Sequence, residues 1–187
     1  VCSSDLPDRA ARRVALERLL LQAGAHPGEI AAQPVQQRGE TDYNLILTLE
    51  PAAPAAATRT DIVVGAHHDA MDGSPGAIDN WSGCVMFAAL YRSLLPARLN
   101  HRFVFVGFAG EEHGQYGSRI FLYRLGGAGR RRLKAMINLE CLGVGAARTW
   151  TNRSADRLEV LFRAAALEAE APVEKQVLFG YTADSAV

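Results

Sequence analysis

Residues 65–83 concentrate side chains that can bind metal ions. This stretch, GAHHDAMDGSPGAIDNWSG, holds two histidines and three aspartates and directly follows the apolar residues DIVV. Carboxylates packed beside one another raise each other's pKa by like-charge repulsion, and a bound dication removes that cost. A mixed set of imidazoles and carboxylates suits zinc, and also manganese or cobalt. The stretch therefore predicts a metal site rather than a solvated turn.

Two further apolar runs end in the same kinds of side chain. The run at 102–109 leads into Glu111 and Glu112, and the run at 134–139 leads into Glu140. One polar strand end is ordinary, and acidic turns are common. Three separate runs that each end in potential ligands are hard to explain as solvated turns.

The apolar run that starts at residue 61 leads into the sequence His-x-Asp, in which Asp69 stands two residues after His67. Residues at i and i+2 of a strand share a face. A metal-bound histidine commonly donates its other ring N–H to a carboxylate, which fixes the tautomer. We interpret His67 as a ligand and Asp69 as the group that orients it.

The elements needed to position these groups alternate along the chain. Apolar and alternating patterns predict strands at 43–50, 61–66, 102–109 and 134–139 and helices at 8–23, 81–99, 116–125 and 154–170. Prolines at 51–60 and glycines at 126, 127 and 129 predict loops. Alternating strands and helices predict an α/β fold of three layers, with a mostly parallel mixed sheet and helices on both faces. Ligands of such folds bind beyond the carboxyl ends of the strands.

Composition narrows the class of protein. The 187 residues predict one domain, and 49% apolar residues are enough for a core. Equal numbers of basic and acidic residues, 20 each, argue against a nucleic-acid partner. No apolar run approaches the ~18 residues of a membrane helix. Three cysteines without regular spacing predict no disulfide framework.

Four consecutive motifs carry a resemblance to a known family. VVGAHHDA, SPGAIDNWSG, FAGEEHGQYGS and MINLECLG resemble the site motifs of the M28 family of zinc metallopeptidases, which includes bacterial aminopeptidases and glutamate carboxypeptidases. The resemblance runs from about Tyr43 to Gly145. It implies a zinc-exopeptidase-like fold, two zinc ions and a peptide or aminoacyl substrate, and it favours a secreted or extracytoplasmic location.

The resemblance also implies residue roles in the first two motifs. His67 matches a terminal zinc ligand, and Asp69 matches the carboxylate that orients it. Asp79 matches the carboxylate that bridges both metals, and a non-proline cis peptide is expected after it.

The last two motifs complete the implied site. Glu111 matches the general base and Glu112 a ligand of the second zinc. Glu140 matches the last ligand of the first zinc, where most peptidases of the family carry Asp. The extra methylene is expected to shift this carboxylate and to affect metal spacing or occupancy.

Other polar residues of the same segments receive non-catalytic predictions. Strand alternation points His68 away from His67, so it is assigned a structural role. His113 is expected to contact solvent or the ligands' neighbours, and Trp81 to pack. Asp184, in TADSAV, resembles a segment that normally reads Ser-Asp-His, but Ser185 stands at the histidine position, and Asp184 is assigned no role.

The ends of the chain are expected to be incomplete. Residues 1–6, VCSSDL, read like a translated sequencing-adapter end, so residues 7–187 are predicted to form a single, truncated catalytic domain. The family's last zinc-ligating histidine has no counterpart after His113. We therefore expect the 187-residue chain alone to bind metal weakly and to turn over substrate poorly.

Two alternatives to an exopeptidase stay open. Glutaminyl cyclase chemistry uses the same scaffold for acyl transfer, and some such relatives carry Glu at the position of Glu140. A non-catalytic relative would keep the fold but lose the ligands. The joint presence of His67, Asp79, Glu111 and Glu112 argues against this second alternative.

Overall fold

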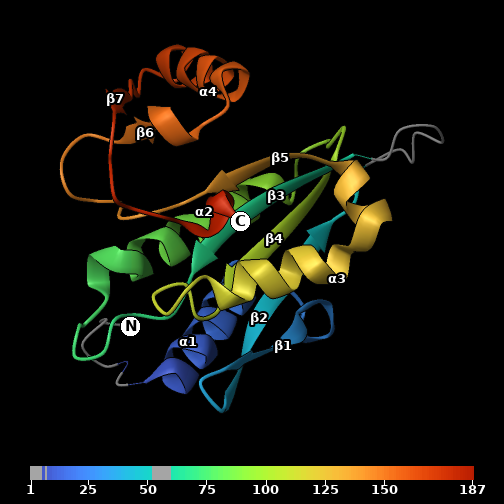
Figure 1. Cartoon of the computed structure of the whole chain (residues 1–187). Coiled ribbons are helices and arrows are strands. Elements are labelled where there is room, and N and C mark those ends of the chain that lie inside the picture. Colours follow the sequence, from blue (N-terminus) through green and yellow to red (C-terminus); the bar gives the residue numbers. More distant parts are fainter. Residues whose placement is uncertain (1–5, 7, 52–59) are drawn as a thin grey trace.

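A computed structural model describes residues 6, 8–51 and 60–187 (Figure 1). The predicted loop at 51–60 falls almost wholly outside these residues. A five-stranded sheet with the order β1-β2-β4-β3-β5 forms the centre. Its strands are β1 Ala31–Gln37, β2 Glu40–Leu49, β3 Asp61–His67, β4 Arg102–Phe108 and β5 Leu133–Asn138.

The direction of the strands determines where the site can lie. β3 pairs in parallel with both β4 and β5, whereas β2 runs antiparallel to β1 and to β4. His67 at the end of β3 lies opposite Phe108 at the end of β4. The carboxyl ends of three neighbouring strands therefore meet at one edge of this mixed sheet.

Helices cover both faces of the sheet, and the hydrophobic core lies between the helices and the sheet (Figure 1). Helices α1 (Arg9–Gln22) and α2 (Gly83–Leu94) pack on one face, and α3 (Tyr116–Arg132) lies on the other. Phe87 and Tyr91 of α2 make edge-to-face contacts with Phe105 of β4. These layers confirm the predicted three-layer α/β class.

Local sequence accounts for the start of α1. The side chain of Asp8 accepts a hydrogen bond from the backbone N–H of Ala11 at 2.7 Å, as an N-cap does. Arg12, Leu16 and Leu20 follow at intervals of four residues, and all three are buried. One buried position of this helix therefore carries an arginine.

The glycine-rich segment after residue 125 differs from the prediction. The sequence predicts a loop there, but α3 continues to Arg132 with a break at Gly126, where φ is +59°. Glycine tolerates that left-handed backbone at no steric cost, so the helix bends and resumes. The predicted helix end at residue 125 coincides with this break, whereas the predicted loop over the glycines is wrong, because a second helical segment runs on to Arg132.

The remaining elements are a strand at the edge of the main sheet and a small unit outside it. Strand β1 contains Pro34 and was not predicted; it lies at the sheet edge, where proline is tolerated. Strands β6 (Arg148–Trp150) and β7 (Glu174–Gln176) pair in parallel. Together with α4 (Asp156–Glu168) they form a small unit that stands apart from the main sheet (Figure 1). Among the described residues, no helix has the length and apolarity needed to cross a membrane.

Candidate metal centre

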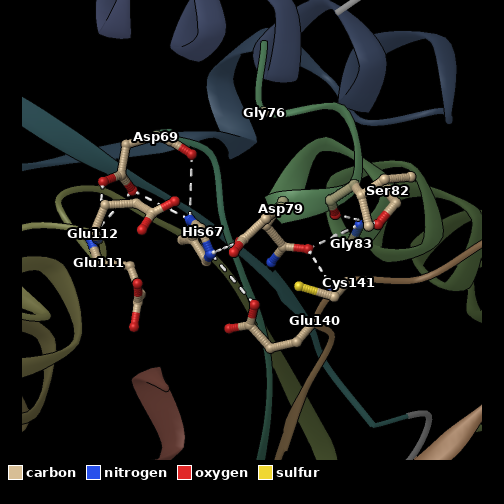
Figure 2. Close-up of polar contacts among 12 residues, drawn as sticks. His67, Asp69, Gly76, Asp79, Ser82, Gly83, Glu111, Glu112, Glu140 and Cys141 are labelled. Atoms are coloured by element: carbon tan, nitrogen blue, oxygen red, sulfur yellow. Dashed lines mark hydrogen bonds and ion pairs between the residues drawn. The ribbon is translucent and has the colours of Figure 1, made fainter. Parts of the chain in front are cut away.

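The imidazole of His67 lies at the centre of the candidate site. Its Nε2 atom is 3.0 Å from Oδ1 of Asp79 and 3.3 Å from Oε2 of Glu140 (Figure 2). Ligand atoms about 2.0–2.1 Å from a tetrahedral zinc ion lie roughly 3.3 Å apart. Both distances match the spacing between ligands of one zinc ion, so each carboxylate could share an ion with His67.

Two overlapping groups of ligand atoms are present among the described residues. His67, Asp79 and Glu112 offer one atom each within 4.8 Å of one another, and so do Asp79, Glu140 and Cys141. Asp79 belongs to both groups. A carboxylate has two oxygens, so Asp79 can contact one ion with each. This arrangement fits the bridging position that the sequence predicts.

Asp69 connects the ends of two strands. Its carboxylate is 3.5 Å from Nδ1 of His67, and the same nitrogen is 3.3 Å from the backbone carbonyl of Asp69. The carboxylate also accepts hydrogen bonds from the backbone N–H groups of Glu111, at 3.1 Å, and Glu112, at 3.2 Å. Asp69 thus orients the imidazole and anchors the glutamate pair, a second contact that the sequence did not predict.

Several acidic side chains surround the imidazole of His67, and these contacts shift the pKa values of the groups involved. Burial alone would lower the pKa of His67, but hydrogen bonds to Asp69, Asp79 and Glu140 raise it well above 6.5. Burial would raise the pKa of Asp69, yet its contact with His67 brings that pKa to about 2. The acceptors around His67 therefore favour positive charge at its ring.

In contrast to Asp69, the carboxyl groups of Glu111 and Glu112 both have raised pKa values. Burial raises the pKa of Glu111 to about 8, and the nearby charges of Asp184, Glu140 and Asp69 contribute to the rise. Burial and the charge of Asp79 raise the pKa of Glu112 as well. These shifts reflect burial first and like-charge repulsion second, and a bound dication would offset both by favouring the charged carboxylates.

Asp79 is positioned by the turn Ala77–Ser82, between β3 and α2. The peptide bond from Asp79 to Asn80 is cis, as the resemblance implied. The buried side chain of Asn80 donates to the backbone oxygen of Leu139 at 2.8 Å and accepts from the N–H of Gly83 at 3.1 Å. The turn that carries Asp79 is therefore hydrogen-bonded to the segment that carries Glu140.

Arg12 of α1 holds the loop that connects β3 to the turn Ala77–Ser82. Its guanidinium donates to the backbone oxygens of His68, Pro75 and Gly76 and lies 5.6 Å from the ring centroid of Trp81. Arg12 is 2% exposed. The sequence analysis missed this residue, although its spacing from Leu16 and Leu20 places it on the buried stripe of the helix.

The structure brings together the metal ligands that the sequence predicts: His67, Asp79, Glu112 and Glu140. His68 is fully buried, and its ring contacts the backbone oxygen of Tyr43 at 3.2 Å, away from the ligands. His113 is outside both ligand groups, and its ring lies 3.9 Å from Asp72. Trp81 is buried, as expected for a packing role.

Two residues near the ligands were not selected from the sequence. Cys141 follows Glu140 and contributes its sulfur to one ligand group. Asp184 is fully buried close to Glu111, and burial raises its pKa to about 7. The sequence signal for Asp184 was its position in TADS. Ser185 stands where the resembling segment has histidine, and this difference obscured the signal.

Comparisons with known proteins agree with this geometry. The sequence profile of peptidase family M28 matches residues 44–185. The probable leucine aminopeptidase 2 of Trichophyton verrucosum (strain HKI 0517) is 30% identical over 82 residues, which are 44% of this chain and 17% of that protein. The chain thus spans less than a fifth of this curated relative.

Solved structures share the fold. A zinc aminopeptidase from Bacillus subtilis superposes with a TM-score of 0.69 at 23% identity, over 79% of this chain and 37% of that one. An Acidobacteriales bacterium glutaminyl cyclase superposes with a TM-score of 0.75 at 13% identity, over 99% of this chain and 73% of that one. With the family profile covering most of its length and the ligands converging at one sheet edge, the chain belongs to peptidase family M28.

Proposed function

We propose that the protein containing this chain is a zinc-dependent exopeptidase that removes N-terminal residues from peptides. The observation that carries the proposal is the spacing of 3.0 and 3.3 Å from Nε2 of His67 to the carboxylates of Asp79 and Glu140. The presence of two overlapping ligand groups, one with Glu112 and one with Glu140, supports two metal positions that share Asp79. Family membership and the aminopeptidase relative support the same chemistry.

The chain's own residues divide the work. His67, Asp79 and Glu140 would hold one zinc ion, and Asp79 and Glu112 would contribute to the second. Bound zinc would lower the pKa of water and polarise the substrate carbonyl. Glu111 takes a proton from the attacking water and returns it to the leaving amine, the role of a general base and then a general acid.

Positioning of Glu111 comes from its backbone. The N–H groups of Glu111 and Glu112 both donate to the carboxylate of Asp69, which also contacts His67. Imidazole, base and second-metal ligand therefore share one buried anchor. This arrangement favours a fixed distance between the proton acceptor and the metal positions, which general-base catalysis requires.

Hydrolysis of an aminoacyl amide by the full-length protein tests the proposal. We expect chelator-sensitive release of the N-terminal residue from a leucyl peptide, restored by added zinc, and no release from the N-acetylated peptide. Activity on the acetylated peptide alone would contradict an aminopeptidase, and activity that resists chelation would contradict a metal mechanism. We also propose an extracytoplasmic location, on the family resemblance alone, which cell fractionation tests.

Glutaminyl cyclisation is the second candidate. The likeness to a glutaminyl cyclase over 99% of this chain and the presence of Glu at position 140 favour considering it. A peptide with N-terminal glutamine distinguishes the two reactions. An aminopeptidase releases free glutamine, whereas a cyclase releases ammonia and leaves a pyroglutamyl peptide.

A further inference from the structure

The thiol of Cys141 lies among carboxylates that the proposed function assigns to metal binding. Its sulfur and one carboxylate oxygen each from Asp79 and Glu140 lie within 4.8 Å of one another. Figure 2 shows the sulfur directed toward these two side chains. Among the described residues Cys141 is one of two free cysteines, and the other, Cys84, is buried in the core.

The backbone explains how two consecutive side chains reach the same place. Successive residues of a strand point to opposite faces, but β5 ends at Asn138 and Cys141 has a φ of +48°. This left-handed residue ends the alternation. The side chains of Glu140 and Cys141 can then approach Asp79 from the same segment.

Hydrogen bonds hold this segment against the turn that carries Asp79. The backbone N–H of Cys141 donates to Oδ1 of Asn80 at 3.2 Å, and that of Leu142 donates to Oγ of Ser82 at 2.8 Å. The side chain of Asn80 also donates to Leu139. The sulfur is thus positioned by the same contacts that position the bridging carboxylate, before any ligand binds.

We infer that the sulfur of Cys141 is a further ligand of the ion that Asp79 and Glu140 would hold, which makes this position a mixed thiolate–carboxylate site for a thiophilic divalent ion such as zinc or cadmium. On binding, the S–H bond breaks, its proton passes to solvent, and the thiolate electron pair forms the bond to the metal. The inference rests on the proposed metal centre and deepens it. Thiolate favours zinc over magnesium or manganese, which prefer oxygen ligands.

Cobalt spectroscopy tests the sulfur bond directly. The protein with Cys2→Ser, which removes the cysteine outside the described residues, is titrated with Co²⁺ while binding is followed by calorimetry. We expect a thiolate-to-cobalt charge-transfer band in the near ultraviolet. The band disappears in Cys2→Ser/Cys141→Ser. It persists in the matched control Cys2→Ser/Cys84→Ser, because Cys84 donates to the backbone oxygen of His67 instead.

Cadmium affinity supplies a second readout. Changes beside metal ligands commonly weaken binding about 10- to 100-fold, so loss of a direct ligand is expected to weaken Cd²⁺ binding by about 100-fold. Mn²⁺ binding changes far less, because its oxygen ligands stay. Equal Cd²⁺ affinity with and without Cys141 would overturn the inference.

The outcomes separate this inference from the proposed function. Co²⁺ that binds the Cys2→Ser protein without a charge-transfer band refutes the role of Cys141 and leaves the metallopeptidase proposal standing. Failure of Co²⁺, Zn²⁺ and Cd²⁺ to bind at all refutes both. A band that survives Cys141→Ser assigns the sulfur bond to another cysteine.

Discussion

At the scale of single residues, the proposed function gives different tasks to two adjacent glutamates. Glu112 lies within the ligand group of His67 and Asp79, whereas Glu111 is outside both ligand groups and has its pKa raised to about 8 by burial and nearby acids. A carboxylate that binds no metal can exchange protons. Substitutions of the two residues should therefore affect different measurements.

We expect Glu111→Gln to lower the rate of peptide hydrolysis by about 100- to 10,000-fold, the usual contribution of a general base. Zinc content, measured by plasma mass spectrometry, stays unchanged because the ligands remain. The matched variant Glu112→Gln loses zinc as well as activity. Equal zinc loss in both variants would contradict the division of roles.

Asp69→Asn should weaken zinc binding by about 10- to 100-fold, because the amide cannot replace the carboxylate that orients His67. The amide oxygen also accepts more weakly from the N–H groups of Glu111 and Glu112. Calorimetric titration with zinc measures the loss. Asp72→Asn is the control, because Asp72 is exposed and outside both ligand groups.

At the scale of elements, the site depends on contacts between segments that are distant in sequence. Helix α1 contributes Arg12 to the loop between β3 and α2, and the end of β5 is bonded to the turn that carries Asp79. Gly83, at the start of α2, allows the second contact. An added Cβ there would lie 2.3 Å from Oδ1 of Asn80 and 2.5 Å from the backbone oxygen of Leu139.

Arg12→Met should lower the free energy of unfolding by about 3 kcal/mol, because the buried carbonyl oxygens of His68 and Gly76 lose their donor at about 1–3 kcal/mol each and the half-buried one of Pro75 loses its donor as well. Zinc affinity falls too, since the loop before Asp79 is released. Urea unfolding and zinc titration measure both effects. Arg18→Met, at an exposed position of the same helix, should change either quantity little.

Gly83→Ala should destabilise the fold by about 1–3 kcal/mol, the usual cost of overpacking. The expected readout is a lower denaturation midpoint together with weaker zinc binding. Gly28→Ala serves as the control, because an added Cβ at Gly28 meets nothing within 4 Å. Similar effects of both substitutions would show that the close approach to Asn80 and Leu139 is unimportant.

At the scale of the whole molecule, metal binding and folding should be coupled. The proposed ligands come from β3, from the segments after β4 and β5 and from the turn before α2. These segments come together only in the folded chain. An ion that binds the folded state alone stabilises it according to its concentration and affinity.

Zinc at about 100 times its Kd should stabilise the protein by about 2.7 kcal/mol, which for a chain of this size raises the Tm by about 5–10 °C. Differential scanning calorimetry with zinc and with chelator measures the shift. His67→Ala should remove it, whereas His26→Ala, at an exposed turn, should keep it. A zinc-induced shift that survives His67→Ala would place the stabilising ion elsewhere.

The sequence by itself determined which strand ends carry the candidate metal ligands. Parallel strands separated by helices end at one edge of a sheet, so His67, Glu112 and Glu140 could be expected to meet before any coordinates existed. It could not determine the helical continuation past Gly126, because a single left-handed glycine can either end a helix or bend it.

Only the tertiary structure decided which other residues join the site. Arg12 contacts backbone oxygens more than 50 residues away, and Cys141 meets Asp79 through a local left-handed bend and hydrogen bonds to a separate turn. Neither contact follows from periodicity, because each depends on where another segment lies in space. The spacing of residues along the chain identifies the reactive side chains that follow each strand. The packing between elements decides which other residues lie beside them.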